Sequence, residues 1–146
     1  MDVTNREYQK LSKQASPPSP VIKNCIKAFL FGGLICALGQ AITDFAQQGG
    51  LEQKQARLIA SVTLIALSVI LTGFNVYDNI AKHAGAGTLV PITGFANAVV
   101  SPAIEFKAEG FVTGMAAKMF IIAGPVIVYG TVASVLYGVI LVIFGG

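Results

Sequence analysis

The sequence predicts an all-α, polytopic integral membrane protein with three to four transmembrane helices, one segment of which is broken or re-entrant. Hydrophobic residues make up 54% of the 146 residues and charged residues only 12%, against about 25% charged in ordinary globular domains. Residues 28–43, 58–77, 84–104 and 119–146 carry no charge. These stretches approach or exceed the roughly 20 apolar residues that a helix needs to cross a bilayer. Glycine and proline interrupt the third stretch.

The first 21 residues differ from the rest of the chain. They are polar and end in the proline-rich run Ser16–Pro20, where each proline lacks a backbone N–H and restricts the residue before it. We expect residues 1–21 to form a largely disordered cytoplasmic tail and residues 22–146 to form the transmembrane domain. The lysines before the first apolar stretch favour a cytoplasmic N-terminus; they are Lys10, Lys13, Lys23 and Lys27.

We expect the first span over about residues 22–46. Gly33, Ala37 and Ala41 recur every four residues there, and such small residues allow another helix to approach closely. This spacing fits packing inside one subunit or an oligomer interface.

The second span is expected over about residues 56–77. It is rich in Ile, Val and Leu, with few polar residues, and we expect a plain lipid-facing or supporting helix. Because the chain has no Trp, the tyrosines that follow the tail would have to supply any aromatic belt at the membrane edge; they are Tyr77, Tyr129 and Tyr137.

The third apolar stretch is expected to be irregular. A turn over residues 78–87 leads into residues 88–104, which contain Pro91, Gly94 and Pro102. About ten helical residues between the prolines would span about 15 Å, half a bilayer. We expect a re-entrant segment, with a kinked but complete span as the alternative. Irregular backbone at membrane depth must be buried in protein or line a cavity.

The last apolar block, residues 111–144, has Lys118 as its only charge and Gly124-Pro125 near its middle. The block is too long for one untilted crossing and too short for two complete ones. It predicts either a short helix over 111–123 followed by a span over 126–144, or one long kinked helix whose first turns lie outside the bilayer.

Enzyme chemistry has little support in this sequence. There is one His, and there is no Ser/His/Asp set, no Walker loop, no HExxH and no CxxC motif. Cys25 and Cys36 would lie about 16 Å apart on a helix, too far for a disulfide. The small net charge of +3 is concentrated near the N-terminus and does not resemble a nucleic-acid footprint. We therefore expect no catalytic residues, cofactor or metal site.

We expect function to be carried by polar and helix-breaking residues near or within the membrane. The candidates are Lys118, Asn97, Glu105, Lys107, Glu109, Pro91, Gly94 and Pro125. An ionisable group at membrane depth costs about 2.5–3.5 kcal/mol and usually faces a bundle interior or water. Lys118 could pair with Glu105 or Glu109, meet an anionic solute, or extend to the membrane surface. A half-helix beginning near Thr93 would present its positive dipole end to an anion.

Several segments carry a resemblance to a known family. They are Phe74–Asp78, Gly85–Asn97, Glu105–Phe111 and Lys118–Pro125, together with Phe31–Gln40 and Asp44. These segments resemble the stage V sporulation protein AC family of endospore-forming bacteria. Phe31–Gln40 and Asp44 also resemble the smaller sibling of that family in the same membrane complex. The resemblance covers about residues 22–130; the tail carries little of it.

This resemblance implies a subunit of a sporulation membrane complex that moves dipicolinic acid, with calcium, into the developing spore and out during germination. The implied location is the inner forespore or spore membrane, and the implied partners are the other stage V sporulation A subunits. A Lys and half-helix N-termini suit a planar dianion. A chain of this size is too small to enclose a wide pore alone, which favours a pore at a subunit interface. A homo-oligomer is one assembly that would provide such an interface. The alternatives are a non-conducting scaffold and, least supported, a small membrane enzyme.

Overall fold

The computed structural model describes residues 4–16 and 19–145 and, within them, contains helices and turns but no strands. Three helices are long and apolar enough to cross a membrane. They are α2 (Val21–Gln48), α3 (Gln53–Gly73) and the continuous helix from Phe111 to Phe144. This confirms the all-α, polytopic membrane architecture.

A short helix, α1 (Asn5–Ala15), occupies most of the segment expected to be a disordered tail. It begins at Thr4, whose backbone N–H and hydroxyl both donate to the Glu7 carboxylate, at 3.0 and 2.7 Å. These two hydrogen bonds, the hydroxyl one first, hold the pKa of Glu7 below its ordinary value. Local capping of this kind stabilises a helix start.

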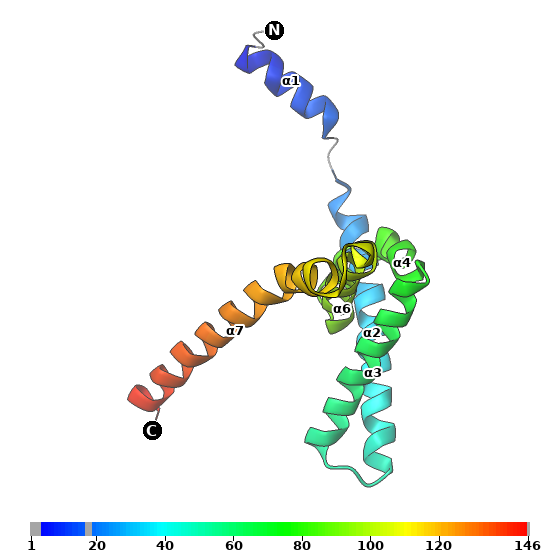
Figure 1. Ribbon diagram of the computed structural model, residues 1–146, viewed down its shortest axis with the longest axis vertical. Helices are drawn as coiled ribbons and strands as arrows, with labels where there is room; N and C mark the ends of the chain where they lie inside the picture. The colour runs from blue at the N-terminus through cyan, green and yellow to red at the C-terminus, as the bar shows by residue number, and fades with distance from the viewer. Residues whose placement is uncertain (1–3, 17–18, 146) are drawn as a thin grey trace.

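Helices α2 and α3 form an antiparallel hairpin, with a turn at Gly49-Gly50 between them (Figure 1). Gly50 has a φ of 90°, a conformation that glycine adopts without strain. Where the two helices pack, a Cβ on Gly39 would lie only 3.2 Å from Leu64. The predicted spans of 22–46 and 56–77 thus match α2 closely and α3 to within a few residues.

The turn expected over residues 78–87 is wrong, because this region is mostly helix. Helix α4 (Val76–Ala84) follows Asn75, whose φ of 58° is left-handed. Apolar residues recur at Tyr77, Ile80 and Ala84, the spacing of one helix face. Acidic and basic residues lie in its first and last turns respectively, as the helix dipole favours.

The third apolar stretch is broken, as predicted. A single helical turn, α5 (Ala86–Leu89), is separated by Val90 and Pro91 from α6 (Ile92–Glu105). Pro102 lies inside α6 and does not end it. The helix is therefore about 21 Å long at 1.5 Å per residue, longer than the half-helix we expected.

The last apolar block is one continuous helix, which excludes the reading as two separate helices. After the short turn η1 (Lys107–Glu109), a π-helical stretch, η2 (Phe111–Ala116), leads directly into α7 (Ala117–Phe144). Pro125 lies within α7. Helix α7 contacts α6 and η2, and its lower part projects away from the α2–α3 hairpin (Figure 1).

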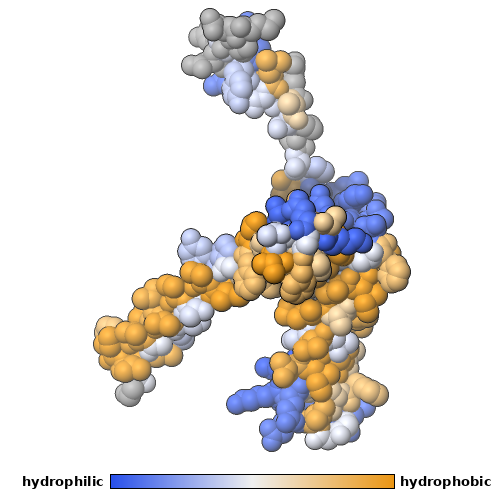
Figure 2. All heavy atoms as spheres, viewed as in Figure 1, coloured by the Kyte–Doolittle hydropathy of each residue, from blue (hydrophilic) through white to orange (hydrophobic). Residues whose placement is uncertain are grey.

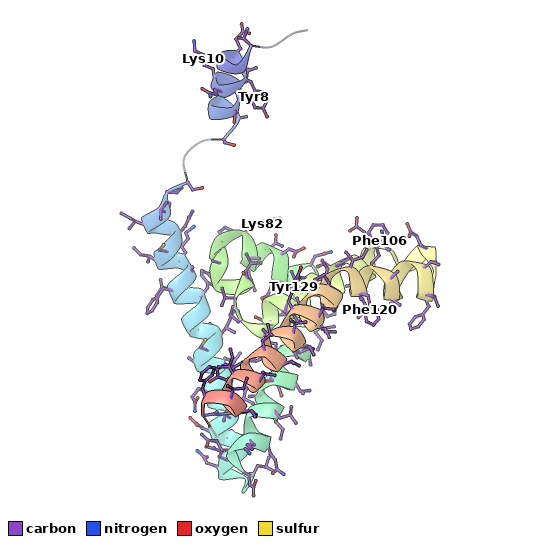
Figure 3. All side chains as sticks on the ribbon, turned by 90° about the vertical axis from the view of Figure 1, so that its left-hand side faces the viewer. Tyr8, Lys10, Lys82, Phe106, Phe120 and Tyr129 are labelled. Carbon is purple, nitrogen blue, oxygen red and sulfur yellow. The ribbon has the colours of Figure 1, made fainter. Side chains whose placement is uncertain are left out.

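The arrangement separates two polar ends by an apolar band (Figure 2). Helices α4 and α6 gather near the end of the hairpin where α2 begins, and α7 descends toward the level of the α2–α3 turn (Figures 1 and 3). Lys82 on α4 and Phe106 after α6 lie at a similar height (Figure 3). The chain therefore enters and leaves the broken segment at the same end of the hairpin.

Candidate functional site

The break between α5 and α6 is the most unusual feature of the apolar band. The Val90 N–H reaches back to the Ala86 carbonyl at 3.2 Å, and the Gly94 N–H bonds to the Pro91 carbonyl at 2.9 Å. Pro91 therefore starts α6 after a sharp change of direction, since it has no N–H of its own to continue the preceding turn. Leu89 and Val90, at the tip, are 70% and 86% exposed.

Glycines make the tight packing of this tip possible. A Cβ on Gly94 would collide with the Thr88 carbonyl oxygen and would lie 2.7 Å from the Leu89 carbonyl oxygen. On the other side of the segment, a Cβ on Gly87 would collide with the backbone of Ala28 in α2. Gly94, predicted as a transport residue, thus acts in the structure as a packing residue beside Pro91.

Tyr77 joins the two arms of the broken segment. Its hydroxyl lies 2.9 Å from the Thr88 carbonyl oxygen and 3.0 Å from the Thr93 hydroxyl, and the side chain is 4% exposed. A tyrosine buried among helices needs such partners for its hydroxyl. Tyr77 is thus a buried anchor and not part of an aromatic belt, whereas Tyr129 is exposed.

Helix α3 supplies a second set of polar contacts to α6. The Ser68 hydroxyl donates to the Thr93 carbonyl at 2.6 Å, and Thr72 lies 2.8 Å from the Asn97 side-chain oxygen. The Thr72 hydroxyl also lies 2.7 Å from the Ser68 carbonyl. Of the two roles expected for α3, the structure thus shows a supporting one, because two of its hydroxyls contact the broken segment.

These contacts give Asn97 a structural role in the single chain. It is half-buried against α3, and its second contact, with Ser101 at 3.4 Å, lies one turn further along α6. Near the end of α6, a cavity of about 310 Å³ is lined by polar groups that include Asp78, Ser101 and Glu105. Glu105 thus faces a small polar cavity close to the Asn97 contacts.

Lys118 contacts an aromatic ring instead of an acid. Its ammonium group lies 4.0 Å from the centre of the Phe106 ring, a cation–π geometry. Glu105, Lys107 and Glu109 are exposed. The structure thus gives Lys118 a partner other than the acids we considered, and among the described residues no hydrogen bond links Lys118 to Asn97.

The remaining candidates lie apart from the break. Pro125 is an exposed residue within α7. Cys25 and Cys36 are both free and exposed. Among residues 4–16 and 19–145, no group of three or more His, Cys, Asp or Glu side chains is placed to hold a metal.

Sequence reasoning identified Pro91, Gly94 and Asn97 but missed Tyr77, Ser68 and Thr72. Hydrogen bonds join Tyr77 to Thr93 and Ser68 to Thr93 across 16 and 25 positions of the chain. The sequence signal that could have identified Tyr77 is its helical spacing with Ala84, because this spacing indicates that one face of α4 points inward.

The chain is similar to known sporulation proteins. A family model described as SpoVAC/SpoVAEB sporulation membrane protein matches residues 24–140. The chain is 48% identical over 134 residues to stage V sporulation protein AC of Bacillus subtilis (strain 168). These aligned residues cover 91% of this chain and 89% of that relative. No solved structure matches the chain.

Proposed function

Because the chain belongs to the SpoVAC/SpoVAEB sporulation membrane protein family, we propose that it is a membrane subunit of the complex that moves dipicolinic acid, with calcium, across the inner forespore or spore membrane. Its partners are then the other stage V sporulation A subunits, and its N-terminus faces the cytoplasm. This proposal assigns the chain no catalytic role.

The break at Val90-Pro91 is the observation that best supports a transport role. Irregular backbone at membrane depth is tolerated where protein or water covers it, and not against lipid. Yet Leu89 and Val90 are largely exposed in the single chain. A neighbouring subunit or a water-filled path beside this tip would satisfy the requirement, which favours a conducting path at a subunit interface.

One observation favours the alternative role of a non-conducting scaffold. Asn97 is already bonded to Thr72, and Lys118 is already placed over Phe106. Two groups expected to line a route are thus engaged within the chain. Dipicolinate flux through liposomes containing the purified protein separates the roles, because a scaffold gives no flux above that of empty liposomes.

Replacing Lys118 with Met tests the site directly. The substitution keeps a long apolar side chain but removes the only charge of residues 111–146. We expect Lys118→Met spores to accumulate less dipicolinate while the protein still inserts. The matched control is Lys54→Met, which removes an exposed charge outside the candidate residues and should have a slight effect. Normal dipicolinate content and release in Lys118→Met spores, at wild-type protein levels, would contradict a transport role for Lys118.

A further inference from the structure

A basic pocket lies where α2 begins, beside the turn between α4 and α5, and it is separate from the contacts at the break. Its volume is about 460 Å³. Ser19 lines it from just before α2, Asn24 and Lys27 line it from the first turns of α2, and Lys82 and His83 line it from the end of α4. None of its lining residues is acidic.

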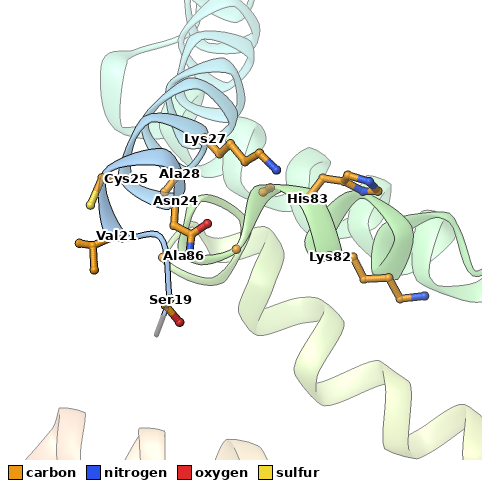
Figure 4. Close-up of a pocket in the computed structure, with 11 residues that line it drawn as sticks. Ser19, Val21, Asn24, Cys25, Lys27, Ala28, Lys82, His83 and Ala86 are labelled. Carbon is orange, nitrogen blue, oxygen red and sulfur yellow. The ribbon is translucent and has the colours of Figure 1, made fainter. Parts of the chain in front are cut away.

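The positive charge of this pocket comes mainly from Lys27. In Figure 4, Lys27 extends from α2 toward α4, where His83 lies, whereas Lys82 points away. Lys82 instead donates to the Asn79 side-chain oxygen at 3.3 Å. The Nδ1 atom of His83 lies 2.9 Å from the Asn79 carbonyl oxygen. Lys27 has no acid beside it in this pocket, and the Asn24 amide adds a hydrogen-bond donor.

An apolar groove adjoins the pocket. It is lined by Pro20, Val21, Ile22, Lys23, Ile26 and Lys27. Val21 and Lys27 line both hollows. Ile22 and Ile26 are 80% and 56% exposed. The basic hollow and the apolar one thus lie side by side on the first turns of α2. From Ile26, the exposed residues Leu30 and Leu34 continue the apolar face toward the other end of the hairpin.

We propose that the two hollows together bind a phospholipid with an anionic headgroup. The phosphate lies in the basic pocket near Lys27 and His83. An acyl chain runs from Ile26 toward Leu30 and Leu34, exposed residues that continue the same face of α2 into the apolar band. Basic pockets between transmembrane helices bind anionic headgroups in this way. The apolar groove favours a lipid over a free anion, because a soluble anion gains nothing from it.

The position of the site gives this lipid a structural consequence. The pocket joins the start of α2 to Ala84, Gly85 and Ala86, which lead into the broken segment. A bound lipid therefore holds the first arm of that segment against α2. This inference does not depend on the cargo of the complex.

Native mass spectrometry of the purified full chain in detergent tests the proposal. We expect the wild-type chain to retain phosphatidylglycerol at least fivefold better than phosphatidylcholine. Each basic group near an anionic headgroup contributes about fivefold in affinity, so Lys27→Gln should remove about that factor and Lys27→Arg should keep the preference. The control Lys54→Gln/Arg57→Gln removes two exposed charges near the other end of the hairpin and should leave the preference unchanged.

Three outcomes would overturn the assignment. Equal retention of the two lipids by the wild-type chain excludes an anionic headgroup site. An equal loss in the control variant shows that overall charge, not this pocket, sets the preference. Glycerol 3-phosphate or dipicolinate that binds as tightly as the lipid shows a site for soluble anions. Circular dichroism of each variant establishes that a loss of lipid is not a loss of fold.

Discussion

At the scale of single residues, the break between α5 and α6 depends on side-chain size as much as on polarity. Gly94 has backbone carbonyls from Thr88 and Leu89 where a methyl group would lie. Such a carbonyl cannot move aside as the end of a flexible side chain can. The absence of a side chain at Gly94 therefore determines how closely the two arms approach.

We predict that Gly94→Ala destabilises the chain by about 1–3 kcal/mol, the usual cost of forcing extra atoms into a packed site. Gly130 is the matched control, because a Cβ there has open space around it and the residue lies within α7. Gly130→Ala should leave stability unchanged or raise it by up to about 1 kcal/mol, since Ala favours a helix over Gly. Thermal unfolding in detergent, followed by circular dichroism, measures both. Equal stability of the two variants would contradict the tight packing at Gly94.

Polarity acts at the same place through Tyr77. We predict that Tyr77→Phe lowers the free energy of unfolding by about 1 kcal/mol, because the Thr88 carbonyl and Thr93 hydroxyl both lose a hydrogen-bond partner. Tyr129→Phe is the control: Tyr129 is 75% exposed, and such surface changes usually stay within about 0.5 kcal/mol. The same unfolding measurement distinguishes them, and a Tyr77→Phe loss no larger than that of Tyr129→Phe would show that these hydrogen bonds contribute nothing.

At the scale of elements, predictability follows how local the signal is. The α2 span could be predicted closely because the absence of charge over residues 28–43 is a property of one segment. The break at Pro91 was likewise visible, since proline acts on its own backbone. Helix α4 was missed because its polar residues obscured the inward spacing of Tyr77 and Ala84. The contacts of Ser68 and Thr72 with α6 could not be predicted, because folding alone brings those segments together.

The broken segment also makes a topological prediction. Its two ends, Ala86 and Glu105, are exposed and lie at the end of the hairpin where α2 begins, whereas Gln48 lies at the other end. In a background with Cys25→Ser and Cys36→Ser, we expect Ala86→Cys and Glu105→Cys to react with an impermeant maleimide from the same side of sealed vesicles. Gln48→Cys should react only from the opposite side.

Ala86 is chosen for this labelling because a side chain at the neighbouring Gly87 would collide with the backbone of Ala28. Labelling of Ala86→Cys and Glu105→Cys from opposite sides would indicate a complete crossing between them. If the N-terminus is cytoplasmic, both cysteines should be labelled from the cytoplasmic side. A reporter fused to the N-terminus measures the orientation of the chain independently.

At the scale of the whole molecule, much apolar surface has no partner within the described chain. Helix α7 has no buried residue. On α2, the small residues Gly33, Ala37 and Ala41 all lie on an exposed face. These three residues therefore do not pack against another helix of the same chain. The close contact between α2 and the broken segment is instead made by Gly32, whose Cβ would meet Gly87. An interface with another subunit is the reading of this spacing that remains.

That reading predicts the effect of a large side chain at Gly33. A Cβ on Gly33 meets nothing within 4 Å, so Gly33→Leu should fold normally but should prevent a second helix from approaching closely. We expect fewer subunits per complex, measured by stepwise photobleaching of labelled chains in liposomes. Leu38→Ala is the control, because Leu38 is exposed but lies about 140° around the helix. If Gly33→Leu has the same number of subunits as the wild type, this face is not the contact between copies of the chain. The face would then contact lipid or a different subunit of the complex.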